Sequence, residues 1–530
     1  MSTGTATTAG RTTAAETGLA TTTVQRRPSR ASYTDDSEAH LFRTRLGSLS
    51  QQDYTQPIDE EEEQNKHHFD ESKATSDTEN SRPPSPPVLA TYPPSQAKPV
   101  ELAAVDQGAA AWRFLACGFV IWSMVWGVAY SYGSFQDYHE HNPDSPLYGT
   151  SVTGISAVGT LVIGCQHFIP LILRGFVTTF PHLRRRLVLV SVVLSSACIL
   201  VASFARSVAM LIVFQGVLFG VTSGVLLLPV VLYLGQWFDT RRGLATGVIF
   251  MGSGFGGVVF PLILNALLTS VGFAWTMRVW ALAQLVLAGT ALWFVRPRLP
   301  LETPDVLPIT KLELARALLP GDLSWLIHPL SLIYLGVVAL QAFGWYIVSL
   351  YIATYATALG FSSTVSTGIL AAFNASAIIG YTITGPSIDK LSFTLGMAVS
   401  SGLCALAALL LLGFAATLPI LLVFAIVFGA AGGGFGCFLT PIARDLAAVT
   451  RSDNALQFLT WMFMRGVAAV TGPLVGSALY RPGVVTKHPR AGEYGINGFN
   501  ALIVFTGACM GVASLIALAA YMYRTKVLGL

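Results

Sequence analysis

The stretch that decides the fold runs from Gly216 to Pro261 and reads GVLFGVTSGVLLLPVVLYLGQWFDTRRGLATGVIFMGSGFGGVVFP. It contains two long apolar runs that are separated by the short polar segment Asp239-Thr240-Arg241-Arg242. Each run belongs to an apolar segment of roughly 20 residues or more, which is the length that a helix needs to cross a lipid bilayer. The stretch therefore predicts two membrane-spanning helices, near 208–237 and 243–268, that are joined by a tight basic loop.

The composition of the whole chain is also that of a membrane protein. Of its 530 residues, 53% are hydrophobic and 11% are charged, whereas a typical soluble domain has about 25% charged residues. Residues 1–110 are acidic, with 16 Asp/Glu against 10 Lys/Arg, so the basic excess lies in the apolar remainder. These proportions exclude a soluble enzyme, a nucleic-acid-binding protein and a secreted disulfide scaffold.

The chain divides into a polar tail and a repeated apolar part. Residues 1–110 are rich in Ser, Thr, Pro and Gln, and they are predicted to be a disordered cytosolic tail because they cannot bury enough apolar surface to offset their ordering entropy. The remainder is predicted to form a six-helix bundle at 111–295, a cytoplasmic linker at 296–327 and a second six-helix bundle at 328–530. The apolar runs lie near 112–137, 151–173, 187–205, 208–237, 243–268, 274–295, 328–357, 364–386, 393–415, 419–441, 455–480 and 498–523.

The charges of the loops predict the orientation in the bilayer. With the N-terminus inside, the inner loops and the C-terminal end collect about fifteen Lys/Arg, and the outer loops collect about four. Cytoplasmic loops of membrane proteins carry an excess of Lys and Arg. Both termini are therefore predicted to be cytosolic.

The centre of the quoted stretch, Gln236 to Gly247, reads QWFDTRRGLATG and resembles the loop between the fourth and fifth helices of monocarboxylate-porter-type transporters. Two further segments, Phe135-Gln136-Asp137-Tyr138 and Gly472-Pro473-Leu474-Val475-Gly476, fit the fungal branch of that family. The resemblance covers roughly residues 112–525. It implies the major facilitator fold, an all-α membrane protein with twelve transmembrane helices in two bundles and a transport site between them.

Small and charged residues near this loop are candidates for gating or structural roles. Gly252 and Gly256 give the predicted fifth helix a bare face that permits close approach of a neighbouring helix, and Pro261 interrupts its hydrogen-bond ladder. These features suit bundles that rock against each other, and ordinary close packing explains the glycines equally well. Arg241 and Arg242 are first of all positive-inside anchors, and a gating ion pair with Asp239 is a second interpretation.

The second half carries Gly385-Pro386-Ser387-Ile388-Asp389-Lys390, which resembles the G-x-x-x-D-[RK] signature of the superfamily. By this resemblance, Asp389 locks the cytoplasmic face through charge pairing and helix-dipole contacts. The first half lacks the equivalent, because Arg174-Gly175 runs into Leu183-Arg184 with no Asp between them. The two halves are therefore not expected to gate alike.

Arg465 is the first candidate substrate contact, because an ionisable residue deep inside a span is costly and marks function by default. It lies about ten residues into the predicted eleventh helix, close to the midplane at about 1.5 Å of rise per residue. No Asp or Glu is predicted at the same depth. The sequence leaves two roles open for Arg465, contact with an anionic solute and a purely structural arginine.

Other polar and aromatic residues at mid-depth complete the predicted substrate contacts, although packing is the alternative role of each. Trp126 and Tyr130, and likewise Gln341 and Trp345, are four residues apart, so each pair shares a helix face. His167 is a proton-carrier candidate whose alternative role is that of a core histidine with satisfied hydrogen bonds. The remaining contacts that we predict are Gln215, Asn374 and Tyr381.

The sequence therefore predicts a secondary active or facilitative transporter that moves a small organic anion, such as a monocarboxylate or related metabolite, by alternating access. Export of a fungal secondary metabolite is the alternative direction, and a non-transporting nutrient sensor is the alternative of another class. The chain has no G-x-x-x-x-G-K-[ST] phosphate loop and no catalytic or metal-ligand cluster, so we expect no enzymatic activity, cofactor or metal. The expected partners are the solute and the lipid bilayer, without nucleic acid, and the default expectation is a monomer in the plasma membrane.

Overall fold

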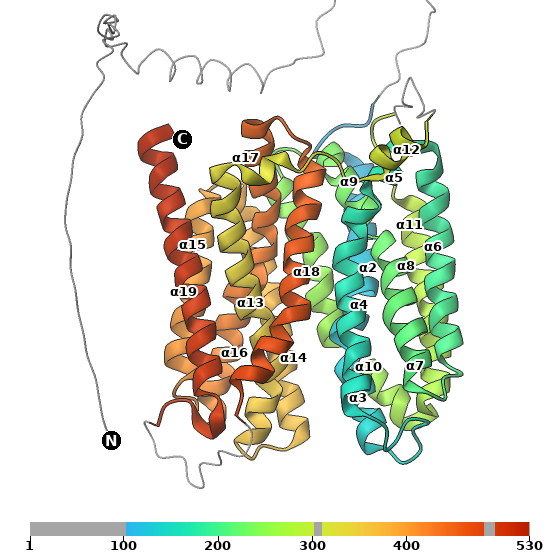
Figure 1. The fold of residues 1–530 in the computed structure, drawn as a ribbon, viewed down its shortest axis with the longest axis vertical. Coiled ribbons are helices and arrows are strands. Elements are labelled where there is room, and N and C mark those ends of the chain that lie inside the picture. Colours follow the sequence, from blue (N-terminus) through green and yellow to red (C-terminus); the bar gives the residue numbers. More distant parts are fainter. Residues whose placement is uncertain (1–101, 301–309, 482–492, 529–530) are drawn as a thin grey trace, which may run out of the picture. The chain divides into compact units, whose positions relative to one another are not determined.

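The computed structural model describes residues 102–300, 310–481 and 493–528. Within these ranges every regular element is a helix, as Figure 1 shows. Helices are expected in lipid because they satisfy their backbone N–H and C=O groups internally. The all-α prediction is thereby confirmed. The predicted tail lies almost entirely outside the described residues, and its boundary at 110 falls inside the first helix, α2, which begins at Gly108.

The first half of the described chain holds α2 to α11. Its first crossing is made of α2 (Gly108–Tyr130) and α3 (Tyr132–His141), which meet at Ser131. The other elements are α4 (Val152–Ile172), α5 (Arg174–Thr179), α6 (Pro181–Ala202), α7 (Val208–Leu211), η1 (Ile212–Leu218), α8 (Phe219–Val225), α9 (Leu228–Trp237), α10 (Arg242–Ala283), η2 (Gln284–Ala288) and α11 (Gly289–Phe294).

The second half begins after a short helix, α12 (Lys311–Leu318), which lies in the predicted linker. Side chains cap several helices at their first turn. For example, the Asp453 carboxylate accepts a hydrogen bond of 2.9 Å from the Leu456 backbone N–H at the start of α18. The elements are η3 (Ser324–Ile327), α13 (Pro329–Ala358), α14 (Ser363–Ile388), α15 (Phe393–Leu406), η4 (Ala407–Leu412), α16 (Leu418–Gly433), η5 (Gly434–Phe438), α17 (Leu439–Thr450), α18 (Asn454–Leu479), η6 (Ile496–Gly498), α19 (Asn500–Tyr523) and η7 (Arg524–Leu528).

Eleven helical segments of the described chain are long and apolar enough to cross a membrane, one fewer than the twelve runs that the sequence predicts. The difference arises in the segment Arg242–Phe294, whose 53 residues exceed the roughly 20 that one crossing needs. Inside it Gly272 has φ 76° and ψ 176°, which is not helical. The chain also returns to the end at which it started, because Trp237 Nε1 donates a 2.9 Å hydrogen bond to the Arg296 carbonyl. This segment therefore contains two antiparallel crossings, which restores the predicted twelve.

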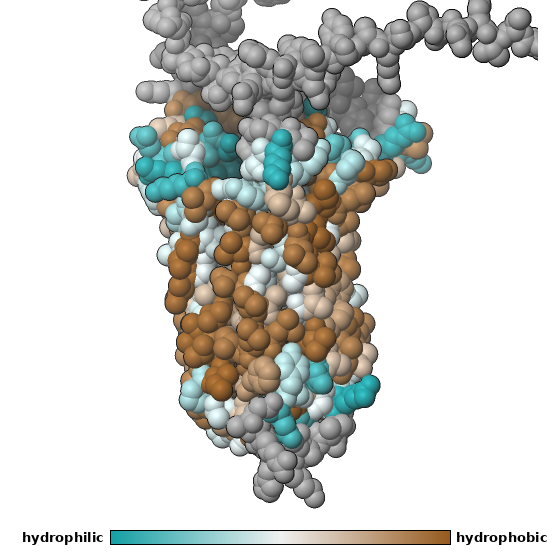
Figure 2. Space-filling view, turned by 90° about the vertical axis from the view of Figure 1, so that its left-hand side faces the viewer, coloured by the Kyte–Doolittle hydropathy of each residue, from teal (hydrophilic) through white to brown (hydrophobic). Residues whose placement is uncertain are grey.

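Apolar side chains cover the middle of the visible face, and hydrophilic residues gather toward its two ends (Figure 2). Large apolar residues of the described chain are exposed, including Leu262, Leu474 and Leu515, which are 62%, 68% and 67% exposed. In water such a surface would be an aggregation or interaction site, whereas in a bilayer it is the lipid-facing surface. We call the end that carries Arg184, Arg242 and Arg444 the basic end, and it is the upper end in Figure 1.

Candidate transport site and gate

Arg465 lies on α18, about 17 Å from the start of that helix at 1.5 Å of rise per residue, and its side chain is buried with 9% of the residue exposed. Its Nη1 donates a 2.8 Å hydrogen bond to Gln341 Oε1 on α13. Gln341 in turn donates from Nε2 to the Gly432 carbonyl over 3.2 Å. The guanidinium also lies over the ring of Tyr346, 5.8 Å from its centroid. In the described part of the chain, no Asp or Glu forms an ion pair with Arg465.

His167 connects this arginine cluster to the first bundle. Its Nε2 lies 3.1 Å from the hydroxyl of Tyr346 on α13, and its Nδ1 lies 2.9 Å from the Ile163 carbonyl on its own helix. The imidazole ring also packs edge-on against Trp126 at 4.4 Å. Both ring nitrogens thus have partners, and one of the two contacts joins the bundles at mid-depth.

The aromatic side chains of α2 continue from this contact. Trp126 stacks on Tyr130 with centroids 6.1 Å apart, and Tyr130 lies within electrostatic range of Tyr346, Tyr381 and Arg465. The indole Nε1 of Trp126 is buried and has no hydrogen-bond partner among the described residues. A buried N–H without a partner is costly, so this donor is a candidate for contact with a solute.

Asn374 on α14 makes a second contact between the bundles, because its Nδ2 donates to the Gly257 carbonyl of α10 over 3.3 Å. The two helices approach closely at glycines. A Cβ added at Gly247 would lie 2.7 Å from the Tyr381 carbonyl oxygen, and one added at Gly385 would lie 2.8 Å from the Gly243 carbonyl oxygen. Only glycine fits such a backbone contact without a shift.

The other face of α10 packs against α2 in the same way. A Cβ added at Gly252 would lie 2.5 Å from the Phe119 carbonyl oxygen, and one added at Gly256 would lie 2.6 Å from the Cα of Gly127. The bare face that the sequence predicts is therefore used in packing within the first bundle, while other glycines of α10 face the second bundle. Helical dihedrals continue through Pro261, and the interruption lies at Gly272.

Two predicted substrate contacts lie apart from the arginine cluster. Trp345 packs inside the second bundle, with its ring 4.7 Å from Phe373 and 6.3 Å from Phe428. Gln215 is buried in the π-helical segment η1, and its Oε1 has no hydrogen-bond partner among the described residues. The structure thus gathers Arg465, Gln341, Tyr130, Trp126, His167 and Tyr381 near one level, and it adds Tyr346, which sequence reasoning missed.

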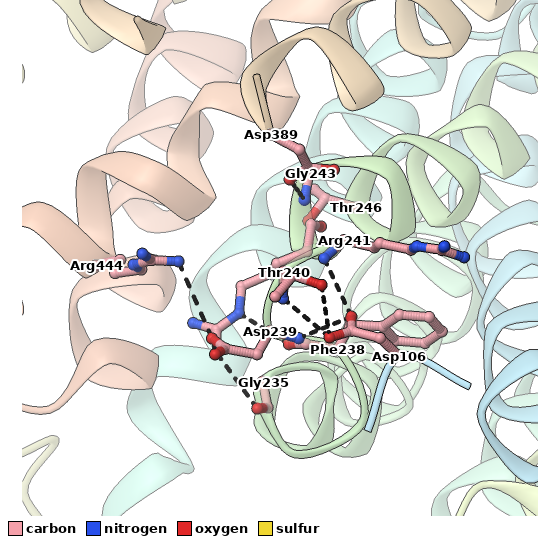
Figure 3. A network of polar contacts seen from close by, with 11 residues as sticks. Asp106, Gly235, Phe238, Asp239, Thr240, Arg241, Gly243, Thr246, Asp389 and Arg444 are labelled. Carbon is pink, nitrogen blue, oxygen red and sulfur yellow. Dashed lines mark hydrogen bonds and ion pairs between the residues drawn. The ribbon is translucent and has the colours of Figure 1, made fainter. Parts of the chain in front are cut away.

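The basic end holds a network of polar contacts that joins the two bundles (Figure 3). Asp389, at the end of α14, accepts hydrogen bonds from the backbone N–H groups of Gly243 at 2.7 Å and of Leu244 at 2.9 Å. These are the first residues of α10, so the carboxylate also faces the positive end of the helix dipole. The contact joins the signature of the second half to the loop of the first half.

Asp239 lies between two arginines of this network. Its Oδ1 is 3.4 Å from Arg242 Nη2 on its own loop and 4.0 Å from Arg444 Nη1 on α17 of the second bundle. The backbone N–H of Arg241 donates to Asp106 over 3.1 Å, while its side chain points away from Asp239 in Figure 3. The ion pair that the sequence proposes for Asp239 is therefore found with Arg242 and not with Arg241.

Two further residues of the basic end make contacts that the sequence did not predict. Asp106 accepts hydrogen bonds from the backbone N–H groups of Asp239, Thr240 and Arg241 at 3.0, 3.0 and 3.1 Å, and from the Thr240 hydroxyl at 2.9 Å. Burial raises the pKa of Asp106, but these hydrogen bonds outweigh burial and hold the pKa below its ordinary value of 3.8. Asp106 thereby fixes the loop that carries the gate.

The second residue is Arg174, which also joins the two bundles at the basic end. Its Nη2 lies 2.8 Å from Asp453 Oδ2 at the start of α18, and its Nη1 donates to the Pro320 carbonyl over 2.6 Å. Only the arginine itself could be noted from the sequence. It belongs to the basic part of the G-x-x-x-D-[RK] signature, which is the part that the first half retains. Its acidic partner lies 279 positions away and cannot be found by spacing.

The polar contacts between the bundles thus gather at the basic end and at mid-depth. This arrangement can hold the basic end closed while a cationic, aromatic-lined centre lies between the two halves. It has the parts that an alternating-access carrier needs, namely a central polar site and a breakable contact at one side of it.

Comparisons with known proteins agree with this arrangement. The sequence profile of the Major Facilitator Superfamily matches residues 114–473. The MFS-type transporter pynF of Aspergillus niger is 27% identical over 78% of this chain and 90% of its own, and the aspyridones efflux protein apdF of Emericella nidulans is 26% identical over 79% of each. The crystal structure of the human organic anion transporter MFSD10 (TETRAN) shares the fold, with a TM-score of 0.54, 16% identity, and coverage of 78% of this chain and 99% of that one. The chain therefore belongs to the Major Facilitator Superfamily, a family of membrane transporters and not of enzymes.

Proposed function

We propose that this transporter exports a small organic anion by alternating access, and that Arg465 binds the acidic group of the solute. The observation that carries the proposal is a buried cation at the junction of the bundles without a carboxylate partner in the described chain. A buried charge is costly unless it is paired. The hydrogen bond to Gln341 uses one of the five N–H donors of the guanidinium, so a carboxylate can be bound through two others.

The direction of transport rests on the relatives and on the charge of the loops. One relative is named as an efflux protein, and the basic end is the one that the positive-inside rule assigns to the cytosol. We assign both termini to the cytosol, the protein to the plasma membrane and the chain to the monocarboxylate-porter-like subfamily. The conformation described here is then closed toward the cytosol. Opening requires the loss of the Asp389 contacts with α10 and of the Arg174–Asp453 pair.

The experiment uses the full chain reconstituted in proteoliposomes, with a panel of organic carboxylates and their neutral amides, with and without a pH gradient. Arg465→Ala should reduce carboxylate transport by about thirtyfold or more, because truncation of a buried charge contact costs about 2–5 kcal/mol. Arg465→Lys should also be impaired, because an ammonium cannot reproduce the planar two-point contact. The matched control is Arg206→Ala, which removes an exposed arginine at the opposite end.

Two results would overturn the proposal. The first is carboxylate transport at the wild-type rate by Arg465→Ala protein that is inserted and monodisperse. The second is equal transport of the amides and of the corresponding acids by the wild-type protein. A pH gradient that stimulates transport would identify proton coupling, for which His167 is the proposed carrier, and His167→Gln should then abolish that stimulation.

A further inference from the structure

A cavity of about 260 Å³ lies between the bundles near the basic end, separate from the arginine cluster. It is enclosed by α2, α9 and α10 of the first bundle and by the start of α17 and α18 of the second. We propose that this cavity is a capture site for a planar, ring-bearing organic anion that enters from the basic end. This inference rests on the proposed function and specifies the class of solute and its first binding site.

The apolar wall of the cavity is aromatic. Trp122 and Phe250 stack with centroids 4.9 Å apart and an interplanar angle of 17°, and Phe458 lies 6.3 Å from Phe250. The three rings come from α2, α10 and α18, so both bundles contribute to the wall. Two aromatic rings in stacked or edge-on contact gain an attraction beyond the burial of their surface area, so such a wall suits a solute that carries a ring.

The polar rim of the cavity includes several hydrogen-bond donors. Arg242 is the charged residue among the described residues of the lining. Its Nε and Nη2 contact the Phe238 carbonyl and Asp239, so its Nη1 is the group that can meet a solute. Gln236 accepts from the backbone N–H of Arg298 through its Oε1, which leaves its Nε2 as the donor end. Asn454, the first residue of α18, completes the rim. Such a rim fits a solute whose edge carries acceptor oxygens or a carboxylate.

The size of the cavity sets the size of the occupant. A dry protein cavity of about 150 Å³ holds benzene, so 260 Å³ is enough for a fused pair of rings. A long or branched solute would exceed this volume unless the bundles separate. The volume, the stacked rings and the donor rim together specify a flat bicyclic acid.

A line of rings leads from the cavity to the centre. Trp122, Trp126 and Tyr130 follow one another at four-residue spacing on α2, with centroid distances of 6.4 and 6.1 Å. Trp126 then contacts His167, which lies beside the Tyr346 ring that Arg465 covers. A solute that loses contact with one ring meets the next about 6 Å further on. The capture site and the cationic centre thus form the two ends of one path.

The test uses 2-naphthoate, a bicyclic carboxylate, with cyclohexanecarboxylate as a probe of equal charge without an aromatic face. Binding of each radiolabelled probe is measured on the full chain in lipid nanodiscs, in the wild-type and the Arg465→Ala backgrounds. Ala455→Phe fills the cavity from its lining, and Ala519→Phe adds the same ring to the exposed face of α19 as the matched control. Phe458→Leu removes one ring with little change in volume.

In the Arg465→Ala background, 2-naphthoate should still bind, and Ala455→Phe should weaken that binding by about tenfold or more, while Ala519→Phe leaves it unchanged. Phe458→Leu should weaken it by about three- to tenfold, the range that corresponds to one aromatic contact. The inference is overturned if Ala455→Phe and Ala519→Phe bind alike, if both probes bind equally, or if Arg465→Ala abolishes all binding. These outcomes leave the proposed function standing, because that proposal depends on the transport rates of the Arg465 variants.

Discussion

Replacing Asp389 by asparagine should shift the transporter toward the conformation that is open at the basic end. The carboxylate accepts two backbone hydrogen bonds, 2.7 and 2.9 Å long, at the N-terminus of α10. An amide keeps one acceptor oxygen and loses the charge. The loss of a charge at a helix N-terminus costs about 0.3–1 kcal/mol, and a charge-assisted bond exceeds a neutral one by about 1 kcal/mol. Asp389 is exposed, so solvent screening reduces the sum to about 1 kcal/mol.

A change of about 1 kcal/mol alters the ratio of closed to open conformations about fivefold. A closed population of roughly nine-tenths would therefore fall to about two-thirds. The assay is the distribution of distances between spin labels at Arg186→Cys on α6 and Val449→Cys on α17, exposed positions near the basic end of the two bundles. The labels are placed in a chain whose six cysteines are replaced.

The control for this measurement is Asp137→Asn, which removes an exposed carboxylate of α3 at the opposite end of the first crossing. It should leave the distances unchanged, because Asp137 pairs with His141 on its own helix. An Asp389→Asn distribution identical to that of the wild type would refute the role of this carboxylate in the gate. A similar shift in Asp137→Asn would show that the change is not specific to the contact with α10.

Arg174, Gly256 and Asp106 give three further predictions. Arg174→Ala should also favour opening at the basic end, because it removes a 2.8 Å ion pair between the bundles. The distances between the same two spin labels should therefore increase, and unchanged distances would contradict this role of Arg174. Gly256→Val should lower the melting temperature, because the Cβ of the valine would lie 2.6 Å from the Cα of Gly127 and overpacking costs about 1–3 kcal/mol. Gly133→Ala should leave the melting temperature unchanged, because nothing lies within 4 Å of its added Cβ. The lowered pKa of Asp106 stabilises the fold at pH values above its ordinary value of 3.8, and this stabilisation is lost as the pH falls through the lower folded value. Asp106→Asn should therefore melt at a lower temperature than the wild type at pH 6, and the difference should diminish below about pH 4; a constant difference would argue against the carboxylate.

Much of the fold follows from the sequence because lipid imposes simple rules of length and backbone satisfaction. Those rules locate the crossings, including the pair joined at Gly272, where the apolar runs at 243–268 and 274–295 leave a short interval. They also predict a buried position for Arg465, because a charged side chain near the middle of a span is costly when it faces lipid.

The contacts of the site were harder to predict, because they depend on the rotation of each helix about its axis. Gln341 and Trp345 share a face at four-residue spacing, yet Gln341 meets Arg465 while Trp345 packs against Phe373. Helical periodicity shows that two residues lie on the same face of a helix. It does not show which neighbouring helix that face contacts. Asp106 was missed for another reason, since a single carboxylate in a polar stretch carries no local sign of a partner more than 130 positions away.

The turn at Gly272 has a mechanical consequence. A single residue with a conformation that suits glycine alone joins the two arms of this hairpin, so any side chain at position 272 would strain the corner. The corner of this hairpin lies at the end opposite the gate, and both of its free ends lie at the basic end, where Trp237 Nε1 donates to the Arg296 carbonyl.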